Sequence, residues 1–119
     1  MTMTEPTRIF HNPRCSKSRQ TLELLQQKGV EPEIIRYLET PPTEQELLHI
    51  LDLLGCEPRQ LMRTKESEYR ELGLNAPELT REELVKAMVN TPKLIERPIV
   101  LANGKAALGR PPENVLDIL

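Results

Sequence analysis

The chain has 119 residues, the length of one domain with a single hydrophobic core. Its net charge of −2 argues against a nucleic-acid-binding protein that relies on a strongly basic surface. Aromatic residues make up only 3% of the sequence, so the core must consist mainly of Leu, Ile and Val. We therefore expect a single domain that covers residues 1–119.

The cysteine content indicates the cellular compartment. Cys15 and Cys56 lie far apart and form neither a CxxC motif nor a Cys/His metal-binding pattern, so we expect no metal and no bound cofactor. Such sparing use of cysteine fits a reducing cytoplasm. Residues 1–7 show no basic segment followed by an apolar run, and the longest wholly apolar run, residues 99–102, is too short to cross a membrane. We expect a soluble cytoplasmic protein with no membrane or nucleic-acid partner.

The first third of the chain predicts a β-α-β unit. Residues 8–11 form a short apolar segment typical of a buried strand, residues 21–28 have the periodicity of a helix, and residues 33–38 read as a second strand. Cys15 lies in the loop that follows the first strand. In open α/β sheets, ligands tend to bind at this carboxyl end of the strands.

The middle of the chain predicts only helices. Thr43 with Glu46, and Thr80 with Glu83, have the spacing of capping boxes at the starts of two helices. Two shorter helical pieces are expected between them, near residues 58–63 and 66–72. We interpret residues 43–90 as an all-helical insertion.

The last third returns to strands. Residues 98–101 and 105–108 flank Asn103-Gly104, a strong hairpin signal, and residues 113–119 form a final helix. The order β-α-β, helices, β-β-α predicts an α/β protein with a thioredoxin-like fold and an all-helical insertion.

The loop around Cys15 favours a reactive cysteine. A residue between a strand end and a helix start meets backbone N–H groups that lack intrahelical partners, and these groups stabilise a thiolate together with the helix dipole. Arg14, Lys17 and Arg19 add positive charge nearby. The alternative is that Cys15 is buried and packs like a small apolar residue, as free cysteines commonly do.

Two familiar kinds of cysteine chemistry do not fit this loop. A phosphatase loop needs an arginine six positions after the cysteine, where this chain has Thr21, and a thioredoxin-type dithiol needs a cysteine where it has Ser18. The resolving thiol must therefore come from Cys56 or from another molecule. Ser18 could hydrogen-bond the thiolate or satisfy backbone N–H groups. His11 could stabilise the thiolate as an imidazolium or bond the backbone at a strand end.

Three arginines could bind an oxyanion through paired, charge-assisted N–H bonds. Arg97 and Arg110 each precede a proline, which restricts their backbone, and Arg63 ends a short helical segment. For any single surface arginine, a solvated charge is more common than a ligand-binding role.

Several segments together resemble the glutaredoxin-coupled arsenate reductase (ArsC) family, in particular its short YfgD-type members. These segments are H-N-P-R-C-S-K-S-R at 11–19, Y-L-E-T-P-P at 37–42, E-R-P-I-V at 96–100 and G-R-P-P-E-N-V-L-D-I-L at 109–119. The resemblance covers residues 8–119. It implies a thioredoxin-like fold, arsenate as the oxyanion substrate, glutathione as co-substrate and glutaredoxin as partner, with arsenic detoxification as the role.

The same resemblance assigns roles to individual residues. Cys15 matches the nucleophile, His11 the histidine that lowers its pKa, and Ser18 the serine one turn further on. The residues that match oxyanion-binding arginines are Arg63, Arg97 and Arg110. Pro98 resembles a proline that is typically cis and faces the cysteine. This chain differs in reading C-S-K-S where well-known arsenate reductases read C-G-T-S, so Lys17 places an additional charge beside the nucleophile; Cys56 matches no family position and is interpreted as structural.

Two other functions remain open at this point. One is a monothiol oxidoreductase that acts on glutathionylated substrates. The other is a Spx-like regulator that binds a partner protein and senses redox state, although such proteins usually carry a CxxC motif and this chain has Ser18 at the second position.

Overall fold

The computed structural model describes residues 6–119, so the expectations for the first residues of the chain lie outside the described part. The chain forms two units, one made of Met1–Thr40 with Arg97–Leu119 and the other of Pro41–Glu96. The second unit is the expected insertion. We describe each unit by itself.

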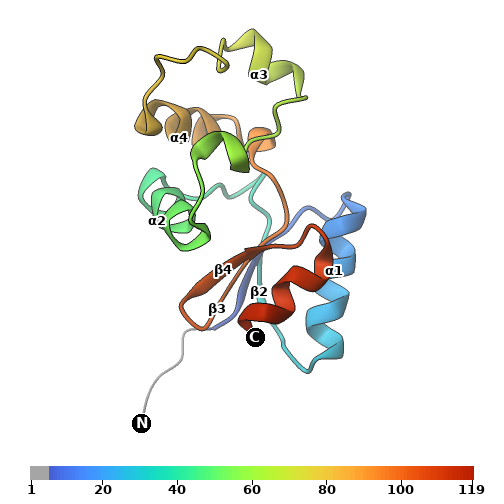
Figure 1. Ribbon diagram of the computed structural model, residues 1–119. Coiled ribbons are helices and arrows are strands. Elements are labelled where there is room, and N and C mark those ends of the chain that lie inside the picture. The colour runs from blue at the N-terminus through green and yellow to red at the C-terminus, as the bar shows by residue number, and fades with distance from the viewer. Residues whose placement is uncertain (1–5) are drawn as a thin grey trace. The chain divides into compact units, whose positions relative to one another are not determined.

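The first unit is built on a four-stranded mixed sheet (Figure 1). Its strands are β1 (Arg8–Phe10), β2 (Glu33–Ile35), β3 (Ile99–Ala102) and β4 (Lys105–Leu108), in the order β2-β1-β3-β4. β1 runs parallel to β2 and antiparallel to β3, and β3 runs antiparallel to β4. This confirms the β-α-β and β-β-helix arrangement expected of a thioredoxin-like fold.

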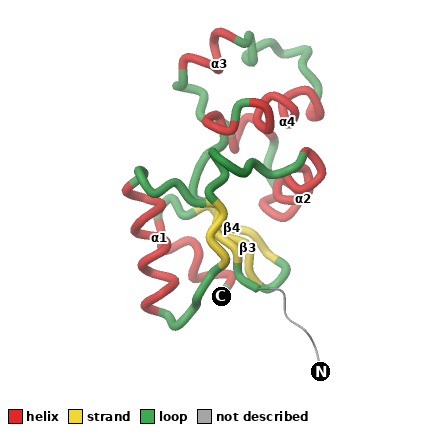
Figure 2. Tube along the Cα trace, turned by 180° about the vertical axis from the view of Figure 1, so that it is seen from behind, coloured by secondary structure: helices red, strands yellow, loops and turns green. Residues whose placement is uncertain are grey.

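Two helical segments pack against this sheet. α1 (Ser16–Gln27) connects β1 to β2, and the 3₁₀ segment η3 (Pro112–Ile118) packs against both α1 and β4. Figure 2 shows α1 beside the strands from behind. The core here consists of Ile9, Leu25, Val100, Ala102, Val115 and Ile118. Ile9 and Val100 are register partners on neighbouring strands, so their side chains share the face that α1 and η3 cover.

Local signals set several boundaries in this unit. Asn103 and Gly104 have φ of 54° and 73°, the positive values that a two-residue type I′ hairpin requires, and the predicted hairpin is confirmed. The second strand is shorter than expected, ending at Ile35, because the carbonyl of Arg36 accepts hydrogen bonds from the N–H groups of Glu39 and Thr40 and closes a turn. The C-terminal helix is present, as a 3₁₀ helix.

The second unit contains the predicted helices. Its principal helices are α2 (Glu44–Leu54) and α4 (Arg81–Asn90), which pack together, and between them lie η1 (Pro58–Leu61) and α3 (Ser67–Glu71). Both expected capping boxes form, at Thr43 with Glu46 and at Thr80 with Glu83. Leu47, Ile50 and Leu51 of α2 are fully buried, because residues three and four positions apart lie on one face of a helix.

The insertion extends further than the predicted end at residue 90. An additional 3₁₀ turn, η2 (Pro92–Leu94), follows α4. Met62 and Ile95 then form an isolated antiparallel bridge, with the N–H of Arg63 donating to Leu94 O at 2.7 Å. This pairing joins residues distant in sequence, so it leaves no periodic signal.

Candidate active site

Cys15 lies at the N-terminus of α1, where it occupies the N-cap position. Only 9% of the residue is exposed, and its thiol makes no cap hydrogen bond. The N–H groups of the first helical turn are therefore available to a negative charge on Sγ. Burial raises the pKa of Cys15, but the N–H of Ser18, the charge and side chain of Arg97 and the N–H of Lys17 outweigh it and lower that pKa. The site thus favours the thiolate.

Ser18 connects the start of α1 to the end of β1. The residue is fully buried, and its Oγ lies 2.6 Å from Nδ1 of His11. The same oxygen accepts a hydrogen bond from the N–H of Asn12 at 3.0 Å. Ser18 therefore satisfies a backbone N–H group, as one interpretation of the sequence held, and it also fixes the imidazole.

Two interpretations of His11 were open, an imidazolium beside the thiolate and a histidine that bonds the backbone at a strand end. Burial is the main effect that lowers the pKa of His11, and the positive charges of Arg36 and Arg19 lower it further. His11 N–H donates to Ile35 O at 2.8 Å, so its backbone is also fixed at the strand end. The neutral imidazole is the favoured form here, and it acts on Ser18 rather than as a fixed cation.

Arg97 and Arg110 lie together in the first unit. Nη1 of Arg110 donates to the carbonyl of Arg97 at 3.2 Å. Nε of Arg97 is buried and has no hydrogen-bond partner among the described residues, although a buried N–H group normally has one. The Arg97–Pro98 bond is cis, as the resemblance implied, and so is Arg110–Pro111, which the sequence did not predict. Arg97 thus offers an unused donor beside Cys15.

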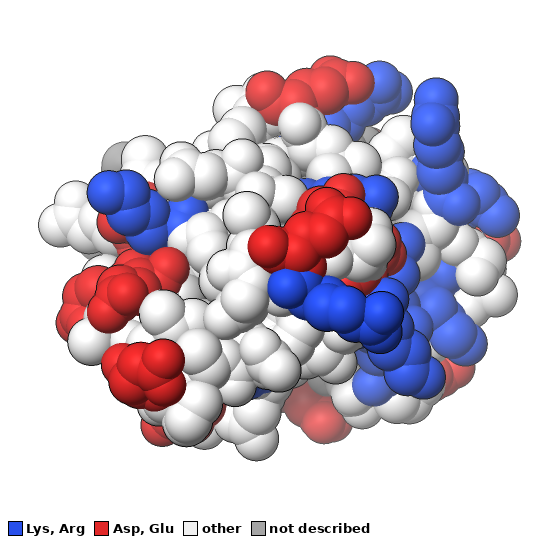
Figure 3. Space-filling view, turned by 90° about the horizontal axis from the view of Figure 1, so that it is seen from above, with Lys and Arg blue, Asp and Glu red and all other residues white. Residues whose placement is uncertain are grey.

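The charges around these residues favour an anion. Residues 6–22 and 97–112, which carry Cys15, Arg97 and Arg110, contain no Asp or Glu. On the face shown in the space-filling view, most Lys and Arg side chains lie toward one side, with Asp and Glu side chains beside them and on the other side (Figure 3). A binding site without carboxylates attracts oxyanions more strongly.

Arg63 belongs to the second unit, where two carboxylates hold it. Its Nε and Nη1 each lie 3.1 Å from a carboxylate oxygen, of Glu66 and of Glu96 respectively. Glu66 also pairs with Lys93. The structure thus brings together Cys15, His11, Ser18, Arg97 and Arg110 in one unit, and the grouping of Arg63 with them stays a prediction.

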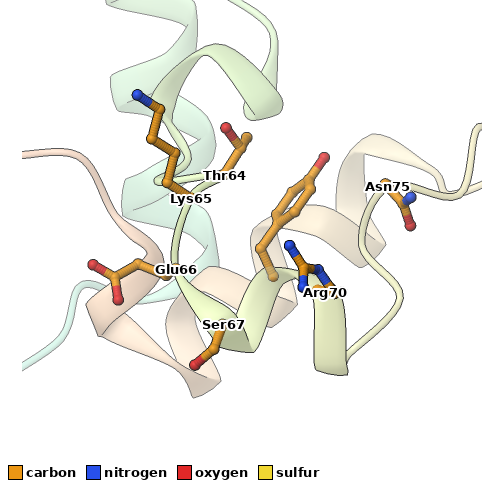
Figure 4. A pocket seen from close by; sticks show the side chains of 7 residues that line it. Thr64, Lys65, Glu66, Ser67, Arg70 and Asn75 are labelled. Atoms are coloured by element: carbon orange, nitrogen blue, oxygen red, sulfur yellow. The ribbon is translucent and has the colours of Figure 1, made fainter.

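A pocket of about 560 Å³ lies in the second unit and is lined by residues that come after Arg63 in the chain (Figure 4). It is lined by polar side chains, among them Lys65, Arg70 and Asn75. It contains no cysteine or histidine, so it supplies no nucleophile. Among the described residues, no cluster of three His, Cys, Asp or Glu could hold a metal, and no helix is long and apolar enough to span a membrane.

Sequence reasoning missed Arg36. This residue follows β2, and His11 follows β1, so the two lie at the same edge of the sheet because β1 and β2 are parallel. That rule could have identified Arg36 as a neighbour of His11.

Comparisons with known proteins show the family to which this chain belongs. The ArsC family matches residues 10–118. The chain is 57% identical to the uncharacterized protein YfgD of Escherichia coli K12, over 98% of this chain and 99% of that protein. It is 52% identical to an arsenate reductase of Neisseria meningitidis Z2491, over 94% and 97%. The structure of an arsenate reductase from Vibrio cholerae superposes with a TM-score of 0.94 at 51% identity, over 98% of this chain and 100% of that one. This chain therefore belongs to the ArsC family and has its thioredoxin-like fold.

Proposed function

We propose that the protein reduces arsenate to arsenite, with Cys15 as the single nucleophile. Relatives that are about half identical to this chain over nearly its whole length are named arsenate reductases. The observation that carries the proposal is the pairing of a thiolate-favouring cysteine with the unpartnered, buried Nε of Arg97. A guanidinium donor of this kind suits a tetrahedral oxyanion.

The first step is binding of the anion. Arsenate oxygens accept hydrogen bonds from Nε of Arg97 and from the guanidinium of Arg110, while the N–H groups of Ser18 and Lys17 stabilise negative charge at the sulfur. Ser18 and the neutral His11 hold the start of α1 in place. Arg63 completes the proposed set of oxyanion-binding arginines, and Pro98 supports Arg97.

The reduction of the bound arsenate then proceeds through covalent sulfur–arsenic intermediates. The Cys15 thiolate attacks As(V), an S–As bond forms, the As–O bond breaks, and the oxygen leaves as hydroxide, which takes up a proton from solvent to give water. Glutathione displaces a second oxygen as water, which gives an arsenic bonded to two sulfurs. The glutaredoxin thiolate attacks the glutathione sulfur, so an S–S bond forms and the electron pair of the broken As–S bond stays on arsenic as As(III). Water then hydrolyses the Cys15–As bond, which releases arsenite and restores the thiolate.

The need for external thiols is supported by the properties of the two cysteines. Both are free thiols, and the second, Cys56, lies in the other unit. Burial raises the pKa of Cys56, which disfavours the thiolate that disulfide exchange requires. Glutathione and glutaredoxin are therefore the proposed reductants. Free thiols also fit the proposed cytoplasmic location.

A coupled assay tests the proposal. Arsenate is supplied with glutathione, glutaredoxin, glutathione reductase and NADPH, and NADPH oxidation is followed. We expect Cys15→Ser to abolish turnover, whereas the matched control Cys56→Ser should retain it. Arsenate turnover by Cys15→Ser at the wild-type rate would exclude the mechanism.

A second candidate follows from the same lowered pKa of Cys15, because a thiolate also attacks disulfides. In that case the natural substrate is a glutathionylated protein. Parallel assays with arsenate and with a glutathionylated peptide, on one preparation, distinguish the two. A higher kcat/KM for the peptide would favour the oxidoreductase function.

A further inference from the structure

Gly109 comes unusually close to α1 and Pro98. It is buried and does not have a positive φ, so its backbone conformation alone does not call for glycine. Space does. A Cβ at this position would overlap Oγ1 of Thr21, and it would lie 2.7 Å from Cγ of Pro98 and 3.0 Å from Cγ2 of Thr21. Since real Cβ atoms essentially never come closer than 3.0 Å, any side chain here requires Thr21, Pro98 or the backbone of Gly109 to shift.

Thr21 is the α1 residue at this contact. It is fully buried, and its hydroxyl donates to the carbonyl of Lys17 at 2.8 Å, with the carbonyl oxygen of Gly109 at 3.5 Å. A β-branched side chain in a helix has little rotamer freedom. Thr21 is therefore a rigid spacer at the position where a phosphatase loop would carry its arginine.

The contact lies between the two segments that form the anion site. The N–H of Gly109 donates to Pro98 O at 2.9 Å, which joins Gly109 to the residue after Arg97. Arg110 follows Gly109 directly, and its guanidinium reaches the Arg97 carbonyl. On the other side, Thr21 lies in the helix that Cys15 caps.

We infer that Thr21 and Gly109 are positioning residues that set the distance between Cys15 on α1 and the arginines Arg97 and Arg110. The inference rests on the proposed function for its kinetic consequence. Its physical content, the approach of Arg97 to the cysteine sulfur, is independent of the substrate. A displacement of about 1 Å at a site of this kind can cost up to about 100-fold in rate.

The experiment measures the thiolate of Cys15 without arsenate. The pH dependence of iodoacetamide alkylation of Cys15 is recorded by mass spectrometry in wild type and variants. We expect Gly109→Ala to move the alkylation profile to higher pH and to slow the reaction at pH 7 by about threefold or more, because Arg97 retreats from the sulfur. Thr21→Ala combined with Gly109→Ala should recover at least half of that loss, because two of the three close neighbours are then gone.

Gly104→Ala is the matched control. This glycine has a φ of 73° and nothing within 4 Å of a built Cβ, so the change strains the hairpin without filling space near the site. We expect it to lower the stability, as Gly109→Ala does, and to leave the Cys15 profile unchanged. If Gly109→Ala fails to fold, Thr21→Val, which keeps the shape and removes the hydroxyl, should keep the wild-type profile while Thr21→Ala shifts it.

Two results would overturn the inference. One is a wild-type Cys15 profile in folded Gly109→Ala, and the other is a shift in Gly109→Ala that the second change fails to reduce. Because alkylation involves no arsenate, a wild-type protein that lacks arsenate turnover would refute the proposed function and leave this test intact.

Discussion

The imidazole Nδ1 of His11 and the hydroxyl of Ser18 lie 2.6 Å apart, and both residues are buried. His11 directly follows β1, and Ser18 belongs to the first turn of α1. Their hydrogen bond therefore joins the strand to the helix that begins at Cys15. It fixes the direction in which the first helical N–H groups point.

We predict that Ser18→Ala destabilises the protein by about 1–3 kcal/mol, because it leaves the His11 nitrogen and the Asn12 N–H without their shared partner. Urea denaturation followed by circular dichroism measures the change. Ser16→Ala, an exposed position one residue after Cys15, is the control and should change stability by less than about 0.5 kcal/mol. Equal stabilities of the two variants would show that the buried hydrogen bonds contribute nothing measurable.

The lowered pKa of His11 predicts a pH dependence of stability. As the pH falls below the ordinary histidine value of 6.5, the unfolded chain takes up this proton before the folded protein does. Stability that is present above that pH is therefore lost as the pH falls through the lower folded value. Chemical denaturation between pH 8 and pH 5 should show this loss.

His11→Asn tests the assignment, because an amide can replace the ring nitrogen toward Ser18 but cannot titrate. We expect a lower stability at pH 8 and a weaker decline toward pH 5. His49→Gln, at an exposed position of α2, serves as the control and should keep the wild-type decline. A wild-type slope in His11→Asn would assign the pH dependence to other groups.

The elements that the sequence predicted best are those with local causes. Thr43 accepts a hydrogen bond from the N–H of Glu46, and Asn103-Gly104 forms the hairpin turn. Each of these structures involves only residues that are close together in the sequence. Residue type and spacing contain that information completely. For the same reason the loop before α1 could be recognised as an environment for a thiolate.

The features that sequence reasoning missed depend on tertiary contacts. The neutral state of His11 requires burial and the nearby charge of Arg36, which comes from the next strand. The extension of the insertion depends on the Met62–Ile95 bridge between distant residues. Neither leaves a periodic pattern. The arginines were identified through the family resemblance, because a solvated surface arginine and an anion-binding arginine cannot be distinguished in a single sequence.

The two cysteines should differ in reactivity. The pKa of Cys15 is lowered, because the N–H of Ser18 and the charge of Arg97 outweigh its burial, whereas burial raises the pKa of Cys56. With limiting iodoacetamide at pH 7.5, we expect labelling of Cys15 first, by about tenfold or more. Peptide mass spectrometry gives both rates in one experiment.

Arg97→Gln should raise the pKa of Cys15 and slow its alkylation at pH 7.5, because the charge and the hydrogen bond are both lost. Arg110→Gln is the comparison and should have the smaller effect, since its charge is not among the causes of the lowered pKa. Equal labelling of Cys15 in wild type and Arg97→Gln would remove Arg97 from the environment of the thiolate.

Arg63 is held by Glu66 and Glu96 through Nε and Nη1, which leaves Nη2 as the guanidinium nitrogen without a carboxylate contact among the described residues of its own unit. Orientation by two carboxylates prepares an arginine to bind an anion with little loss of side-chain entropy. We predict that Arg63→Gln raises the KM for arsenate by about tenfold, the effect of losing one charge-assisted hydrogen bond, with a smaller change in kcat. Arg70→Gln, at an exposed arginine of the same unit, should keep the wild-type KM. If Arg63→Gln keeps the wild-type KM and instead lowers the stability, the role of Arg63 is to pair with Glu66 and Glu96 within the insertion.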